Sequence, residues 1–372
     1  MPVVERLGLE QIDSCRPLLA CSPFHPYGHY VARLGNGALE SLHFARLRAC
    51  READGAEGLI IPGPAGASAL AIWRRLAWDS QQLGVEAGQL CFLLSEGGYQ
   101  RQQELSTLLL ERVLERCGDQ GIRLLSARLD SSDGVAIHLL ERHGFLLVDG
   151  ILTFSVDLER ASAQSPCRPD LPAPFLLQGV RGYTGQGSLS SAGEGPAERP
   201  APPHPDVYHH CLDSVTIRAA GPGDLDHLKA LARRSYAHDR FHSDPLIPRQ
   251  AADNVYAAWI ENACLGHGAD VVIVAERNGC LEGYVSCALD REAESHLGLR
   301  IGTIGLVATA PEARGHGLAR AIIAAALEWF WSQGAVIVEV GTQLRNLPAA
   351  RLYESMGFRL VSTSVSFHKW LG

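Results

Sequence analysis

The 372-residue chain has no long run of lysine or arginine, and its 41 acidic residues outnumber its 33 basic ones. Without a basic patch, a nucleic acid is not expected as a partner. The chain also lacks an uncharged apolar stretch of about 20 residues, the length that a helix needs to cross a bilayer. Its most apolar segment, Leu318 to Trp331, contains Arg320 and Glu328. We therefore expect a buried helix there and no membrane span.

Other features that are missing concern export and metal binding. The sequence does not open on a basic and then apolar leader with a small-residue cleavage site. Its ten cysteines are scattered singly, without a CxxC pair, which is typical of a reducing compartment rather than of a disulfide framework. The histidines form no ligand pattern. We expect a cytoplasmic protein without a metal site.

One segment differs in composition from the rest of the chain. Nine of the twenty prolines lie between Ala161 and Asp206, among glycine-rich and serine-rich stretches without apolar periodicity. Such a composition predicts a linker without stable structure over 161–213. The linker separates a first domain, 1–160, from a second domain, 214–372, in agreement with the two domains expected of a chain of this length.

The two domains are related in sequence. When the chain is shifted by 213 positions, residues 93–158 align with 306–371 without a gap, and 16 of the 66 positions are identical. Several identities fall on turns and on core positions: Gly121 matches Gly334, and Gly144-Phe145 matches Gly357-Phe358. Predicted strands and helices alternate in the second copy. We therefore expect a duplicated α/β (α+β) fold with a central mixed sheet flanked by helices.

A glycine-containing loop in the second copy has the features of an anion site. A predicted strand, 300–308, leads through Arg314-Gly315-His316-Gly317-Leu318-Ala319 into a long helix. Free N–H groups at a helix N-terminus favour phosphate, glycines allow the backbone to approach it closely, and Arg314 adds a positive charge. Two glycines alone would equally fit an ordinary strand-to-helix turn.

The wider pattern resembles the GNAT superfamily of N-acetyltransferases. Arg314-x-x-Gly317-x-Ala319 resembles the acyl-CoA loop of that superfamily, and Asn346, Tyr353 and Met356-Gly357-Phe358 follow it in the same order. The resemblance covers 214–372 and implies acetyl-CoA as co-substrate. It also implies that strands 305–307 and 338–341 splay apart around the pantetheine arm. Leu306, Val307 and Ala308 would then bind this arm and polarise the thioester carbonyl.

Two further residues have roles implied by this resemblance. Tyr353 is placed where the superfamily has a tyrosine that protonates the departing CoA thiolate, and a phenol is suited to this transfer. The alternative is a core residue, because Ala349, Ala350 and Met356 share its helical stripe. Asn346 is predicted to cap the helix that follows and to contact the cofactor arm.

The first copy lacks these chemical residues. Arg101 matches Arg314, but Gln102, Glu104 and Ser106 stand where the second copy has Gly315, Gly317 and Ala319. A carboxylate in the loop opposes phosphate binding. Leu140 replaces Tyr353, and Asp133 replaces Asn346. We predict that residues 1–160 form a degenerate copy without a CoA site.

A second resemblance indicates which class of amine accepts the acetyl group. The chain resembles bacterial dTDP-fucosamine (dTDP-4-amino-4,6-dideoxygalactose) acetyltransferases, which also combine a degenerate copy of the fold with an active one. The segments that carry it are Leu76–Val85, Arg240-Phe241-His242, Tyr256-x-x-Trp259-Ile260-Glu261-Asn262, Val340–Asn346 and Ser362-Thr363-Ser364. It implies that Arg240, Phe241, Tyr256 and Trp259 form the acceptor site, with the arginine on diphosphate and the aromatics on base or sugar. Tyr256 and Trp259 would equally fit the buried stripe of a helix.

No general base stands out. Asp149 aligns with an acidic position of those enzymes, and Glu339 is a second candidate; a solvated carboxylate with a water chain as base is the alternative for both. We expect transfer of an acetyl group to a small primary amine, first of all a nucleotide-linked amino sugar. Another small amine, a protein or peptide amine, and a non-catalytic acyl-CoA sensor are the other possibilities.

Overall fold

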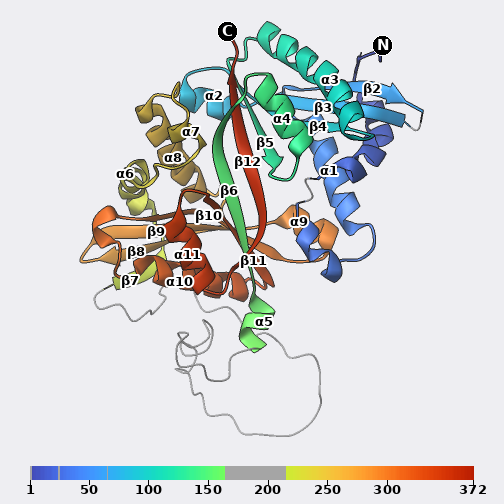
Figure 1. Cartoon of the computed structure of the whole chain (residues 1–372). Coiled ribbons are helices and arrows are strands. Elements are labelled where there is room, and N and C mark those ends of the chain that lie inside the picture. Colours follow the sequence, from blue (N-terminus) through green and yellow to red (C-terminus); the bar gives the residue numbers. More distant parts are fainter. Residues whose placement is uncertain (1, 24–25, 65, 164–214) are drawn as a thin grey trace, which may run out of the picture.

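The computed structural model describes residues 2–23, 26–64, 66–163 and 215–372 (Figure 1). The predicted linker, 161–213, lies outside these ranges apart from its first three residues, which end helix α5. Within the described ranges, no helix is both long and apolar enough to span a bilayer.

The first copy begins with two 3-10 helices and continues as alternating strands and helices. Its elements are β1 (Glu5–Arg6), η1 (Leu9–Cys21), η2 (Gly28–Arg33), α1 (Ala38–Glu52), β2 (Ala56–Gly63), β3 (Gly66–Arg75), α2 (Ala77–Leu83), β4 (Ala87–Ser95), α3 (Tyr99–Asp119), β5 (Leu124–Asp130), α4 (Gly134–Arg142), β6 (Leu146–Asp157) and α5 (Leu158–Ala163).

The second copy repeats the order from the first long hairpin onward. Its elements are β7 (Val215–Ala219), η3 (Pro222–Asp224), α6 (Leu225–Ser235), α7 (Arg240–Ser243), α8 (Arg249–Cys264), β8 (Val271–Arg277), β9 (Cys280–Leu289), α9 (Arg291–Leu297), β10 (Ile301–Thr309), η4 (Pro311–Ala313), α10 (Leu318–Ser332), β11 (Ile337–Gln343), α11 (Leu347–Ser355) and β12 (Arg359–Trp370).

All twelve strands form one mixed sheet, and the two copies exchange their last strands within it. The order is β1-β2-β3-β4-β5-β12-β6-β11-β10-β9-β8-β7. β12, the last strand of the second copy, pairs with β5 of the first, whereas β6, the last strand of the first, pairs with β11 of the second. The two exchanged strands also pair with each other and run side by side through the centre of the molecule (Figure 1).

The exchange places one aromatic residue of each copy in the core of the other. Phe154 of β6 packs in the core formed around α10 and α11, and Phe367 of β12 packs against α3 and α4. Both side chains are about 1% exposed. Because a fully buried phenylalanine stabilises a fold by about 1.5–3 kcal/mol, each copy contributes to the stability of the other.

Candidate active site

The glycine loop leads from β10 through the 3-10 turn η4 to the N-terminus of α10. Gly315 and Gly317 have φ angles of +83° and +81°, in the left-handed region that other residues rarely adopt. An added Cβ at Gly315 would meet no atom within 4 Å, so conformation rather than crowding favours glycine there. Gly317 is the N-cap of α10 and offers no side-chain partner to the first N–H groups of this 15-residue helix. These N–H groups and the helix dipole are suited to an anion.

The charged side chains of the loop point to solvent. Arg314, Gly315, His316 and Gly317 are exposed, whereas Leu318 is buried and anchors the helix. The Arg314 Nε donates a hydrogen bond to the Thr309 carbonyl at 3.3 Å. Among the described residues it forms no salt bridge, so its charge is available to a ligand.

Beside this loop, β10 and β11 separate. They pair in parallel only from Ile301 with Ile337 to Ile304 with Val340, although β10 continues to Thr309 and β11 to Gln343. The register of β10 with β9 is irregular between Ile304 and Val307. Beyond Ile304, the side of β10 that faces β11 therefore has backbone groups that β11 does not satisfy, and such groups need another partner.

The bulged part of β10 has its own contacts on the side of β9. The Leu306 N–H donates to the Ser286 hydroxyl at 2.8 Å, and the Tyr236 hydroxyl donates to the Val307 carbonyl at 3.2 Å. Leu306 and Ala308 are buried, whereas Val307 is half-buried. The strand is therefore held rigidly at the point where the two strands separate.

Tyr353 lies in α11, two turns after the end of β11. It is 3% exposed and packs against Phe154 and Phe358, with ring centroids 5.9 and 5.7 Å away. Within the described chain its hydroxyl makes no hydrogen bond, and burial raises the pKa of the phenol above its usual value of about 10. The group therefore stays protonated and can act as a proton donor. Asn346 is the helix N-cap, and its side chain accepts from the Ala349 N–H at 3.4 Å.

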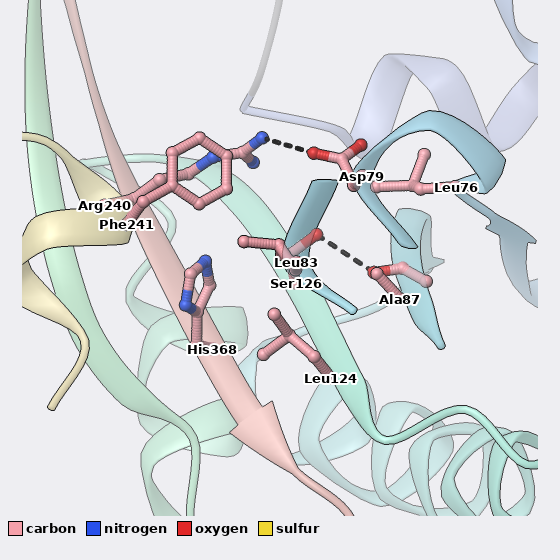
Figure 2. A pocket seen from close by; sticks show the side chains of 10 residues that line it. Leu76, Asp79, Leu83, Ala87, Leu124, Ser126, Arg240, Phe241 and His368 are labelled. Carbon is pink, nitrogen blue, oxygen red and sulfur yellow. Dashed lines mark hydrogen bonds and ion pairs between the residues drawn. The ribbon is translucent and has the colours of Figure 1, made fainter. Parts of the chain in front are cut away.

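The four predicted acceptor residues lie on two helices, α8 and α7, and differ in exposure. Tyr256 is 4% exposed and stacks on Tyr236 at 3.9 Å, which places it in the core stripe of α8, whereas Trp259 is 44% exposed. Arg240 and Phe241 open α7 and line a small pocket between the two copies. Figure 2 shows the Arg240 guanidinium directed toward Asp79 of α2, with the Phe241 and His368 rings beside it; the Arg240 Nη2 lies 3.5 Å from the Asp79 Oδ1.

The two candidate bases are in different surroundings. Glu339 is held by residues of η2: its Oε1 accepts a hydrogen bond from the Tyr30 hydroxyl at 2.8 Å and lies 3.0 Å from the His29 Nε2. Asp149 of β6 is buried, and burial together with the nearby Asp239 raises its pKa to about 7. A carboxylate with this pKa exchanges a proton near neutral pH, as a general base must.

Sequence reasoning missed several residues of this junction, among them Asp79, Tyr236 and His368. Asp79 lies inside the segment 76–85 that carried the second resemblance, and this was the one available signal for it. His368 reaches the site only because β12 has crossed to β5, and the sequence pattern does not contain this pairing.

Comparison with known proteins agrees with this geometry. Residues 234–358 match the acetyltransferase (GNAT) family. A tandem GNAT protein from the clavulanic acid biosynthesis pathway has a similar structure, with a TM-score of 0.56 over 100% of this chain and 99% of that one, at 14% identity. The chain has a tandem GNAT fold, and its match to the GNAT acetyltransferase family lies in the second copy. The predicted duplicated α/β fold is thus confirmed.

The related sequences include a polysaccharide biosynthesis protein and two proteins named as acetyltransferases. The spore coat polysaccharide biosynthesis protein SpsD of Bacillus subtilis is 36% identical over 168 residues, and dTDP-fucosamine acetyltransferase of Escherichia coli is 32% identical over 142. These segments are 45% and 38% of this chain and 55% and 57% of those proteins, so the chain spans about half the length of either relative. Mycothiol acetyltransferase of Thermobispora bispora is 29% identical over 254 residues, 67% of this chain and 70% of that protein.

Proposed function

We propose that the protein is an acetyl-CoA-dependent N-acetyltransferase and that the reaction takes place in its second copy. One observation carries the proposal: strands β10 and β11 separate beside a loop whose left-handed glycines lead directly into α10. The loop N–H groups and Arg314 would hold the diphosphate, and the backbone of β10 at Leu306–Ala308, on the side that β11 leaves open, would hold the pantetheine arm. Loop residues His316 and Ala319 flank the same phosphates, and Asn346 lies at the far side of the opening.

The chemistry assigned to these residues is direct acetyl transfer. A neutral amine attacks the thioester carbonyl, so that the C–N bond forms and the C–S bond breaks. A backbone N–H near Val307 or Ala308 stabilises the oxyanion, Asp149 accepts the proton lost by the amine, and Tyr353 gives its proton to the sulfur. Glu339 is the weaker candidate for the base because Tyr30 and His29 already occupy its carboxylate.

For the acceptor we favour a nucleotide-linked amino sugar, and most of all a dTDP-linked 4-amino-deoxy sugar. The names of two relatives point to polysaccharide synthesis and to dTDP-fucosamine, and the placement of Arg240 with Phe241 at the junction pocket suits a charged sugar nucleotide. Trp259, exposed on α8, is available to stack on an acceptor ring, whereas Tyr256 supports the wall from the core.

A second acceptor class is a mycothiol precursor or another small amine. The mycothiol acetyltransferase relative is similar over 254 residues, more than the second copy contains, so the similarity extends beyond that copy. The two acceptor classes differ in charge, because only the sugar nucleotide has a diphosphate.

Release of CoA thiol over a panel of dTDP-amino sugars, mycothiol precursors, polyamines and peptides tests the proposal. We expect turnover with an amino sugar nucleotide at a higher kcat/KM than with any uncharged amine. Tight CoA binding without turnover on any amine would instead support a non-catalytic acyl-CoA sensor.

A further inference from the structure

A row of polar side chains crosses the boundary between the copies on one face of the sheet. In the strand register, Ser366 of β12 lies opposite Arg128 of β5 on one side and opposite Asp149 of β6 on the other. The Arg128 Nε donates to the Ser366 hydroxyl at 3.3 Å. Arg128 and Asp149 belong to the first copy and Ser366 to the second, so the row exists only because the strands are exchanged.

A second guanidinium faces this row from α7. Arg240 lies over the Phe241 ring at 4.5 Å and makes one long contact, 3.5 Å, with Asp79. Arg240 lines the junction pocket together with Ser126 and His368. These two residues lie two positions along β5 and β12 from Arg128 and Ser366, on the same face of the sheet, so Arg240 lies beside the row. Two neighbouring cations repel each other unless an anion lies between them.

The carboxylates nearby do not supply that anion in full. Asp239 is bound to His242 at 2.5 Å, and Asp244 accepts from His368 at 2.7 Å and from Trp370 at 3.0 Å. Asp149 has a pKa of about 7, so it is only partly ionised at neutral pH. Apart from Asp79, at 3.5 Å from Arg240, no carboxylate of the described residues forms a salt bridge with either arginine, so an anion can still bind to both.

Arg128 is also open to a ligand. In the described part of the chain its two terminal amino groups form no hydrogen bond or salt bridge, and its side chain is exposed to solvent. Surrounding protein and Arg240 nevertheless lower its pKa. The terminal amino groups of Arg128 are therefore available to an anionic ligand.

We propose that Arg128 and Arg240 together bind the diphosphate of the acetyl acceptor. The degenerate first copy, through β5, thus supplies half of an anion site to the active second copy. A guanidinium group binds phosphate oxygens in a bidentate way. Two guanidinium groups on different elements therefore suit a diphosphate ligand better than a ligand with a single carboxylate. This inference rests on the proposed function for the identity of the ligand, but not for the existence of the site.

Binding of inorganic pyrophosphate and of dTDP, measured by calorimetry on the full chain saturated with coenzyme A so that the loop at Arg314 is occupied, tests the site without any turnover. We expect both to bind, and Arg128→Gln to weaken both about 10- to 100-fold, as loss of a charge-assisted pair predicts. Arg128→Lys should recover part of the affinity. Arg123→Gln, at an exposed arginine just before β5, is the matched control and should change nothing.

Coenzyme A binding separates this inference from the proposed function. The Arg128 variants should bind coenzyme A as the wild type does, which also shows that they are folded. Pyrophosphate and dTDP affinities that Arg128→Gln leaves unchanged, or no binding of either ligand to the wild type at millimolar concentration, would overturn the two-arginine site. Absence of coenzyme A binding in the wild type would instead contradict the proposed function.

Discussion

The two copies of the fold differ most where the second copy has its glycine loop. In the first copy α3 begins at Tyr99, whereas in the second α10 begins only at Leu318, which aligns with Leu105. The six residues that form the turn and loop in the second copy are thus helical in the first. Gln102 and Glu104, good helix formers, stand where Gly315 and Gly317 adopt φ angles above +80°. The first copy, which lacks the two glycines, therefore has a turn of helix where the second copy has an anion-binding loop.

The arginine of the loop also differs between the two copies, because among the residues that the structure describes it has a carboxylate partner only in the first. Arg101 lies 3.6 Å from the Glu104 carboxylate of its own helix, whereas Arg314 forms no salt bridge within the described residues. The strand pair of the first copy still separates, since β4 and β5 pair only over Ala87–Leu90 and Leu124–Ala127. A pocket remains there, lined by the end of β4, the start of α4 and Cys21 with Pro23. The comparison teaches that the opening between the strands survives without the features that would bind a diphosphate.

The largest effect is expected from removing the first copy altogether. A chain reduced to 214–372 lacks β5 and β6, so β11 loses one neighbouring strand, β12 loses both of its neighbours, and the second core loses Phe154. We expect this fragment not to fold and to aggregate through its open edges. Circular dichroism and gel filtration measure this outcome.

The control is the full chain cut at a protease site placed within 164–213, which keeps every strand and should stay folded. A soluble 214–372 fragment that binds coenzyme A normally would show that the second copy does not need the exchanged strand.

Giving the second copy the loop of the first should abolish cofactor binding. Gly315→Gln combined with Gly317→Glu forces left-handed backbone on two ordinary residues, at about 1–2 kcal/mol each, and adds a carboxylate beside the phosphates. We expect the KM for acetyl-CoA to rise at least about 100-fold. Glu104→Gln in the first copy should leave KM unchanged, and an equal effect of the two changes would contradict the assignment of the site.

Tyr353→Phe tests the second chemical difference, since Leu140 occupies that position in the first copy. Loss of a general acid lowers kcat roughly 100-fold or more, while the affinity for coenzyme A should stay within about threefold. Single-turnover kinetics and calorimetry measure the two quantities. Tyr99→Phe is the matched control on the first copy. Full kcat in Tyr353→Phe would leave this residue with a packing role alone.

The smallest effect is expected in the pH profile. Asp149 has a pKa raised to about 7, so it is protonated below that pH and can accept a proton only above it. We expect kcat/KM to rise with pH through about 7 and this limb to disappear in Asp149→Asn. Glu339→Gln should keep the limb. The reverse result would make Glu339 the base, and a limb that persists in both variants would favour a water chain.

The sequence predicted most of the second copy. The shift of 213 positions showed the duplication, the strand predicted over 300–308 is β10, and the buried helix expected from Leu318 to Trp331 is α10, because these features follow from local pattern. The strand exchange was not predicted, since β6 and β12 have the same pattern and either could follow β5 or β11. The junction around Arg128, Asp79 and His368 depends on that exchange and was missed for the same reason.

The central claim is that one chain holds one cofactor, in the second copy. Calorimetric titration with coenzyme A tests it most directly, on the wild type and on the Gly315→Gln/Gly317→Glu variant. We predict one molecule per chain for the wild type and none for the variant. Two molecules per wild-type chain, or one that still binds the variant, would contradict the account.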